Sequence, residues 1–329
     1  MVDVDVHIAP ASIEVLLDYL PEVWREYVSR TDFAGSPDQV YPPGLPQPRT
    51  EPAPGEAVPA EAEAAILVCL PFLDSVRNPY AAEAVARATN DWQLATWLSA
   101  DGRLRGSIVV ASGQPALAAA EVERLGADRR FAQVLLPLRT AIPYGNLAWR
   151  PLFEAAERHG LPVAFHFGGA PGNAPTSSGW PSYFAEEAAG AAAIAQVQLA
   201  SLIAEGVFAR CPGLRVVFVE AGFAWLPHWA WRADKDWQLL RREVPWVDRP
   251  PSELAQDHVR VTVRPYDGPA DADRLATLLH EPPLELARML LQAGPAPGED
   301  GEGDRLLAAL PEPARTLIGS GNARDLYKL

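Results

Sequence analysis

The chain has 329 residues, of which 48% are hydrophobic and 21% charged, and its formal net charge is −14 at pH 7. That length suits one barrel-sized domain or two ordinary domains. The negative charge argues against nucleic acid or an anionic membrane as a partner. We find no hydrophobic run as long as a membrane span and no signal peptide, and the two cysteines, Cys69 and Cys211, lack metal-binding spacing. We therefore expect a cytoplasmic protein with buried thiols.

The first predicted strand, residues 2–6, alternates valine with aspartate and runs on to His7. Side chains two residues apart point to the same face of a strand, so Asp5 and His7 project together. A carboxylate beside an imidazole suits a divalent metal such as zinc. Taken alone, this short pair is equally a chance feature of a surface strand.

Beyond the first strand, apolar runs and helical patterns alternate along the chain. A helix over residues 12–29 is interrupted by Pro21, and a proline- and glycine-rich loop, residues 30–64, follows as a surface cover. Further strands are predicted at residues 65–70, 106–111, 131–136, 162–167, 214–219, 259–263 and 287–291. Helices are predicted at residues 79–98, 115–125, 149–159, 190–209, 224–242, 270–279 and 322–327.

About eight strands that alternate with helices predict a single α/β domain over residues 1–329, a (β/α)₈ TIM barrel. The apolar runs are continuous, as expected for parallel strands buried on both faces. A doubly wound open sheet is the alternative. No glycine-rich phosphate fingerprint follows the first strand, which disfavours a dinucleotide-binding version of that sheet.

Active sites of such barrels lie at the C-terminal ends of the strands, and polar residues are predicted there. His166 ends an apolar strand and precedes two glycines. A core histidine bonded to a carbonyl is the simpler interpretation, but Asp5 and His7 at the same level favour a metal ligand. Glu220 ends the sixth strand and is a candidate ligand, a group that orients a ligand, or one half of a salt bridge.

Other residues near the predicted strand ends are expected to line a substrate pocket. They are Arg139, Trp180, Tyr183, Trp225, His228 and Arg264. Core packing is the alternative for Trp180 and Tyr183. We expect His258 and His280 at the surface.

Five segments together resemble the amidohydrolase-related family, the branch of the amidohydrolase superfamily that includes aminocarboxymuconate-semialdehyde decarboxylase. They are DVDVH (3–7), LPVAFHFGG (161–169), GWPSY (179–183), VEAGFAWLP (219–227) and NARDLY (322–327). The resemblance implies a metal-dependent barrel, usually with zinc, that hydrolyses or decarboxylates small carboxylated or cyclic substrates. It assigns Asp5, His7 and His166 to the metal and places Glu220 at another polar site position.

The chain departs from the family pattern in two main places. The eighth strand of the family normally ends in an aspartate that binds metal and acts as general base, but Pro295 stands there, within a degenerate loop over residues 292–304. A helix that usually precedes the second strand is also reduced. Our leading hypothesis is therefore a degenerate member, weakly active or non-catalytic, that binds zinc or manganese weakly or not at all.

Two alternatives remain open from the sequence. One is an active metal-dependent hydrolase or decarboxylase that uses Asp5, His7, His166 and Glu220. The other is a metal-independent acid–base enzyme in which His166 and Glu220 are catalytic. In each case the partner is a small molecule, and we expect a homo-oligomer or a hetero-oligomer with an intact paralogue.

Overall fold

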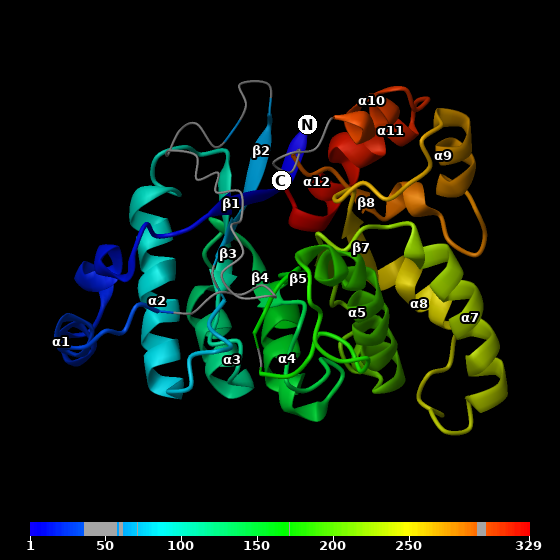
Figure 1. The fold of residues 1–329 in the computed structure, drawn as a ribbon. Coiled ribbons are helices and arrows are strands. Elements are labelled where there is room, and N and C mark those ends of the chain that lie inside the picture. Colours follow the sequence, from blue (N-terminus) through cyan, green and yellow to red (C-terminus); the bar gives the residue numbers. More distant parts are fainter. Residues whose placement is uncertain (36–57, 59–61, 71, 171, 295–300) are drawn as a thin grey trace.

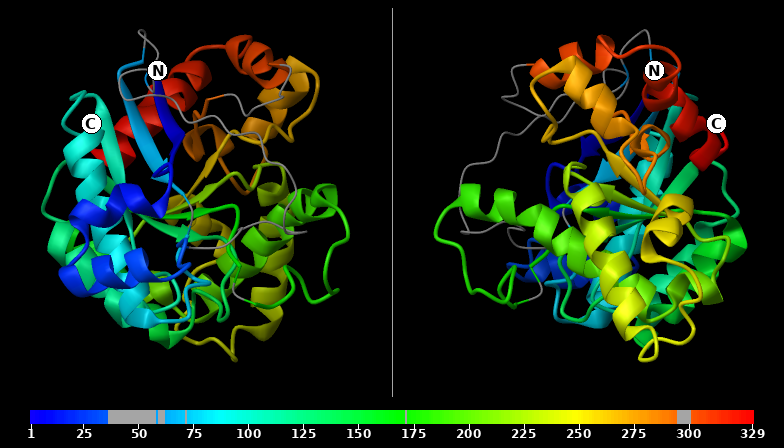
Figure 2. Two further views of the ribbon diagram at one scale, coloured as in Figure 1. Left: turned by 60° about the vertical axis from the view of Figure 1, so that its left-hand side comes forward. Right: turned by 90° about the vertical axis from the view of Figure 1, so that its right-hand side faces the viewer.

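The computed structural model describes residues 1–35, 58, 62–70, 72–170, 172–294 and 301–329. Its eight strands are all parallel and hydrogen-bonded in chain order, from β1 to β8. Helices surround the strands in every view (Figures 1 and 2). The predicted TIM barrel is confirmed. Most of the proline-rich loop, residues 30–64, lies outside the described residues.

The candidate site residues Asp5, His7, His166 and Glu220 lie at or near the C-terminal ends of their strands. The strand bounds are β1 Val2–Ile8, β2 Ala64–Cys69, β3 Leu104–Val109, β4 Phe131–Pro137, β5 Val163–His166, β6 Val216–Val219, β7 Val259–Thr262 and β8 Leu290–Leu291. Beyond β8 the chain returns to β1, because the Val4 amide donates to the Gln292 carbonyl oxygen at 3.1 Å. This contact brings the last strand against the first and closes the barrel around the strand ends.

The α-helices of the described chain are α1 Glu22–Arg30, α2 Pro79–Thr96, α3 Pro115–Leu125, α4 Arg150–His159, α5 Phe184–Ala204, α6 Val207–Arg210, α7 Trp225–Leu240, α8 Pro251–His258, α9 Ala272–Leu279, α10 Glu302–Ala308, α11 Ala314–Thr316 and α12 Asn322–Tyr327. Pro21 splits the first predicted helix, as expected, into a 3₁₀ segment, Ile13–Tyr19, and α1. The helix predicted over residues 190–209 is two helices, because Gly206 turns the chain with a φ of +71°. Helices α8, α10 and α11 were not predicted.

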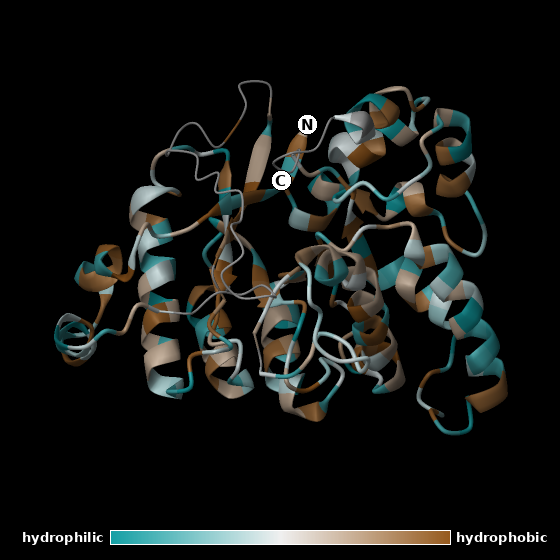
Figure 3. Cartoon of the chain, viewed as in Figure 1, coloured by the Kyte–Doolittle hydropathy of each residue, from teal (hydrophilic) through white to brown (hydrophobic). Residues whose placement is uncertain are grey.

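Buried apolar residues on the strands form two clusters, and much of the strand ribbon is coloured hydrophobic (Figure 3). Phe165 and Phe218 pack outward beneath the helices, whereas Val2 and Ile66 face the barrel interior with Tyr327 of α12. Helix α5 is long and apolar enough to cross a membrane by length and composition, and 44% of its most apolar window is buried in the fold. That burial fits a helix packed against the barrel wall.

The prediction that His258 lies at the surface is wrong, whereas His280 is exposed as expected. His258 is 5% exposed and ends α8 directly before β7. Its ring stacks on Phe208 of α6, with centroids 4.4 Å apart, and its Nδ1–H donates to the Leu214 carbonyl oxygen at 2.8 Å. The short helix α6 therefore encloses the start of β7.

Candidate metal centre

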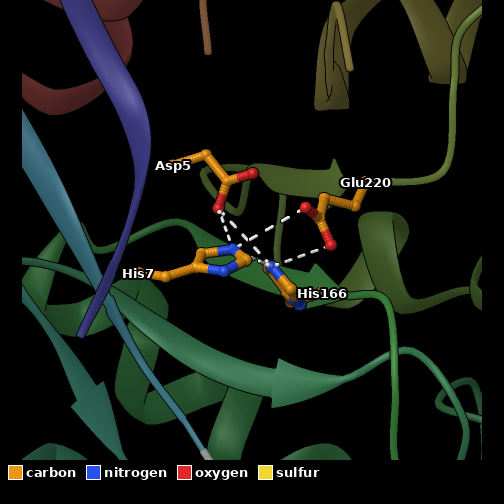
Figure 4. Close-up of side chains that lie close together, drawn as sticks. All are labelled: Asp5, His7, His166 and Glu220. Atoms are coloured by element: carbon orange, nitrogen blue, oxygen red, sulfur yellow. Dashed lines mark hydrogen bonds and ion pairs between the residues drawn. The ribbon is translucent and has the colours of Figure 1, made fainter. Parts of the chain in front are cut away.

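Four side chains converge at the C-terminal ends of β1, β5 and β6 (Figure 4). Asp5, His7, His166 and Glu220 each offer one ligand atom, and these atoms all lie within 4.8 Å of one another. His7 Nε2 lies 3.0 Å from His166 Nε2 and 3.1 Å from Asp5 Oδ1. Glu220 Oε2 lies 3.5 Å from His166 Nε2. The structure therefore brings together every residue predicted for the metal and the catalytic groups.

Strand geometry places three of these groups. Asp5 and His7 share one face of β1 because they are two residues apart. His166 ends β5 and pairs in register with Val219, so the residue after Val219 emerges beside it. The parallel strands thus deliver their polar ends to one point.

Glu220 reaches the cluster through an unusual backbone conformation. Its φ is +55°, in the left-handed region that side-chain-bearing residues rarely adopt. Its amide donates to Thr262 Oγ1 at 3.1 Å, and that hydroxyl donates to the Arg264 carbonyl oxygen at 3.0 Å. Thr262 is fully buried at the end of β7. The hydroxyl of Thr262 therefore fixes the turn that carries Glu220.

His166 is oriented for coordination. Its Nδ1–H donates to the Phe167 carbonyl oxygen at 2.8 Å, which leaves the Nε2 lone pair directed at His7, Asp5 and Glu220. The side chain is only 2% exposed. Such a backbone partner on the far nitrogen fixes the tautomer of metal-binding histidines.

The charges in the cluster shift two pKa values in opposite directions. Burial alone would raise the pKa of Asp5, but the His7 charge and the close approach of both imidazole rings hold it well below its usual range. Burial disfavours protonated His7, yet the Asp5 charge and hydrogen bond, with Glu220 nearby, raise the pKa of His7 to about 9. The carboxylates thus stabilise positive charge at this point.

The donor set fits a divalent cation. Two imidazole nitrogens and two carboxylates form the mixed nitrogen and oxygen set that zinc accepts and manganese tolerates. His7 Nε2 and His166 Nε2 lie 3.0 Å apart, so if His7 loses its proton, two lone pairs face one small volume. A proton or a cation between them relieves that repulsion.

Sequence reasoning missed two residues that support the cluster, Asp3 and Thr262. Asp3 Oδ1 accepts from the Asp5 amide at 3.1 Å and from the Gly294 amide at 3.0 Å, so it ties β1 to the chain after β8. Alternation marks Asp3, since it lies two residues before Asp5 on the same strand. No pattern in the sequence marks Thr262.

The end of β8 brings no carboxylate to the cluster within the described residues. Gln292, Ala293 and Gly294 follow the strand, and Pro295 lies outside the described residues. A side chain on residue 294 would meet Asp3, because a Cβ there would lie 2.7 Å from Asp3 Oδ2. Glu220 is the second carboxylate of the centre instead.

The residues predicted to line a substrate pocket lie in three kinds of place. Arg139 is buried and pairs with Glu187 of α5 at 2.9 Å, and Arg264 is buried and pairs with Asp304 of α10. Trp225 is buried, with its ring against Phe218. The exposed ones are Trp180, Tyr183 and His228.

Comparisons with known proteins agree with this architecture. No curated protein matches the sequence. Among solved structures, the chain resembles 5-carboxyvanillate decarboxylase LigW from Sphingomonas paucimobilis, with a TM-score of 0.73 and 18% identity over 100% of this chain and 99% of that chain. It also resembles 2,6-dihydroxybenzoate decarboxylase from Rhizobium, with a TM-score of 0.68 and 20% identity over 99% of this chain and 98% of that one.

A third similar structure carries a metal. It is a dihydroxybenzoic acid decarboxylase from Polaromonas sp. JS666 with bound manganese and the inhibitor 2-nitroresorcinol, at a TM-score of 0.65 and 21% identity over 100% of this chain and 96% of that chain. At these identities the likeness establishes the fold. The amidohydrolase family model matches residues 2–287, which is most of the sequence. The chain therefore belongs to the amidohydrolase family.

Proposed function

We propose that this protein is a metal-dependent decarboxylase of small aromatic carboxylates, with manganese or zinc held by Asp5, His7 and His166. The observation that carries the proposal is the convergence of four ligand atoms within 4.8 Å at the strand ends. Three solved structures with this fold are decarboxylases of aromatic acids, and one of them holds manganese. These findings support the active alternative.

The four groups have different exposures, which suggests a division of roles. The side chains of Asp5 and His166 are 5% and 2% exposed, so they are available to a metal but hardly to solvent or substrate. Glu220 is 24% exposed and His7 35%, so both face the mouth. A divalent cation at this point would act as a Lewis acid that polarises a bound oxygen of the substrate.

Glu220 is the group we assign to proton transfer. Decarboxylation breaks a carbon–carboxylate bond, releases carbon dioxide and leaves a carbon that must take up one proton. Glu220 has two oxygens, 3.7 Å from His7 Nε2 and 3.5 Å from His166 Nε2, so it can exchange a proton with the cluster while facing solvent. No carboxylate from the described end of β8 competes for this role.

The test is turnover with added metal. Purified protein is stripped with chelator, reloaded with manganese or zinc, and incubated with 5-carboxyvanillate or 2,6-dihydroxybenzoate while carbon dioxide release is followed. We expect metal-dependent release that Glu220→Gln reduces by about two to four orders of magnitude with metal still bound. Binding of metal without turnover of any aromatic acid contradicts the decarboxylase assignment.

A non-catalytic subunit is the second candidate, favoured by the absence of a carboxylate at Ala293 and Gly294. On this alternative the chain binds metal or ligand and assembles with an intact paralogue. Co-expression with such a paralogue and measurement of turnover by each chain alone separate the two candidates. Activity of this chain alone excludes the second.

A further inference from the structure

A cavity of about 380 Å³ lies near the end of the barrel opposite the metal centre. Arg215 directly precedes β6 and lines this cavity, whereas Glu220 directly follows the same strand. Residues of helices α5, α6 and α8 and of the segment 246–249 line the cavity. The volume falls within the roughly 300–1,000 Å³ of small-molecule sites in proteins.

Arg215 is available to an anion. Its Nη1 donates to three backbone carbonyl oxygens, those of Pro212, Gly213 and Leu214, at 3.1–3.4 Å. Among the residues that the structure describes, no carboxylate lies within ion-pair distance of its guanidinium. The remaining N–H groups of that fork match the two oxygens of a carboxylate.

The groups around Arg215 leave its charge unneutralised. Arg249 already pairs with Asp257 at 2.8 Å. Burial lowers the pKa of His258, and the charges of Arg215 and Arg249 lower it further, so its ring is neutral at pH 7. Arg260 at β7 also lacks a carboxylate partner in the described chain, and Arg215 contributes to a lowered pKa there after burial. Two carboxylates line the cavity within the described chain, that of Asp257, which is paired with Arg249, and that of the exposed residue Asp248, which opposes an anion.

The indole ring of Trp246, which also lines the cavity, is held in a fixed position. Trp246 is 51% exposed, yet its Nε1–H donates to the Ala204 carbonyl oxygen at 2.6 Å. The indole also lies against Gly206, where a Cβ would meet Trp246 Cδ1 at 2.6 Å. Gly206 therefore permits the close approach that holds the ring in place. A fixed, half-exposed indole offers a planar ligand a stacking surface at little entropic cost.

We propose that this cavity is a second ligand site, which takes a small aromatic carboxylate with its carboxylate on Arg215 and its ring against Trp246. Ile203, Phe208 and Leu254 supply the apolar lining that such a ring needs. This site is separate from the metal centre and does not depend on the proposed decarboxylase activity.

The experiment follows the indole N–H signal of Trp246 by NMR, assigned with Trp246→Phe, during titration with benzoate. The signal reports this site even when benzoate also binds near the metal centre. We expect a saturable shift, and Arg215→Gln should weaken the apparent affinity about tenfold or more, since a hydrogen-bonded ion pair is lost. Arg232→Gln, at an exposed arginine paired with Asp236 on α7, is the matched control and should leave the titration unchanged.

Three outcomes overturn the proposal. They are an unsaturable or absent shift, an affinity that Arg215→Gln leaves unaltered, and inorganic phosphate or acetate binding as tightly as benzoate, which would leave the ring without a role. If Arg215→Gln does not fold, intermolecular nuclear Overhauser contacts between benzoate and the Trp246 ring in the unaltered protein decide the matter. Their presence supports the site, and their absence under saturation refutes it.

Discussion

The metal centre draws its groups from two unlike parts of the barrel mouth. On one side, which we call the regular side, β1 and β5 present Asp5, His7 and His166 from within strands, although the pairing of β1 with β2 shifts register between Asp3 and Val6. On the other side, which we call the strained side, β6 is followed by a left-handed turn that carries Glu220. The described residues after β8 contribute no ligand. Regular strands fix the direction of a side chain without strain, whereas a left-handed residue with a side chain costs roughly 1–2 kcal/mol.

This difference shows that the strained side depends on its neighbours. The turn after β6 is held by Thr262, which accepts from the Glu220 amide, and by Asp267, which accepts from the Phe223 and Ala224 amides. Both supports come from β7 and the loop beyond it. The strained side is therefore sensitive to substitutions at Thr262 and Asp267 that never touch the metal, whereas on the other side Asp3 supports only the Asp5 backbone.

The largest expected effect comes from the regular side. His166→Ala removes a buried ligand whose Nε2 faces the other three groups, so manganese affinity should fall by more than about 100-fold, the upper range for loss of mere supporting partners. Isothermal titration of stripped protein measures it. His228→Ala, at an exposed residue of α7, is the control and should bind as before. A His166→Ala affinity within tenfold of the parent would show that the centre lies elsewhere.

The same division explains what the sequence could predict. Alternation in β1 and the apolar run before His166 locate the ligands on the regular side, because strand periodicity alone decides where they point. Glu220 was identified as a residue at a strand end, but three roles stayed open, since its direction depends on a φ of +55° set by a hydroxyl 42 residues away in sequence. Tertiary contacts of that kind leave no periodic pattern.

The fold was predicted more completely than the site. Helices α3 and α12 have the predicted bounds, because proline, glycine and apolar spacing act locally. Helix α8 was missed, because the polar residues Ser252 and His258 stand among its buried positions and leave no apolar period. The pairings of Arg139 with Glu187 and of Arg264 with Asp304 also join residues distant in sequence, so neither arginine could be assigned a partner.

A smaller effect on manganese affinity is expected from substitution of Thr262, which supports the turn on the strained side. Thr262→Val keeps the shape of the side chain but leaves the Glu220 amide without its acceptor, so the turn should relax and manganese affinity should fall by about tenfold. Thr262→Ser keeps the hydroxyl and is the matched control. Equal losses for valine and serine would mean that packing, and not the hydrogen bond, holds Glu220.

The pH dependence of metal binding tests the role of His7 on the regular side. His7 has a pKa raised to about 9, so below that pH the metal must displace its proton. Manganese affinity should therefore rise about tenfold per pH unit until pH is about 9 and level off above it. Titrations on either side of that pH, with proton release recorded, test this. A plateau near the ordinary histidine value of about 6.5 would contradict it.

The raised pKa of His7 also predicts the direction in which the stability of the metal-free protein changes with pH. His7 binds its proton more tightly in the folded metal-free protein than in the unfolded chain, so the stabilisation is complete below pH 6.5 and is lost as pH rises towards 9. Metal-free protein should thus unfold at lower urea concentration above pH 9 than at pH 7. His7→Gln should flatten that part of the profile.

The smallest effect is expected for the ion pair between Arg264, which lies just after β7, and Asp304 of α10. The guanidinium is 2% exposed and the carboxylate 42%, so solvent screens the pair and Asp304→Asn should cost about 1 kcal/mol of unfolding free energy. Asp236→Asn, in the exposed pair with Arg232, is the control and should cost less than about 0.5 kcal/mol. Manganese affinity should not change in either variant, because Thr262 contacts the Arg264 backbone and not its side chain. A metal affinity that falls with Asp304→Asn would show that α10 also supports the turn at Glu220.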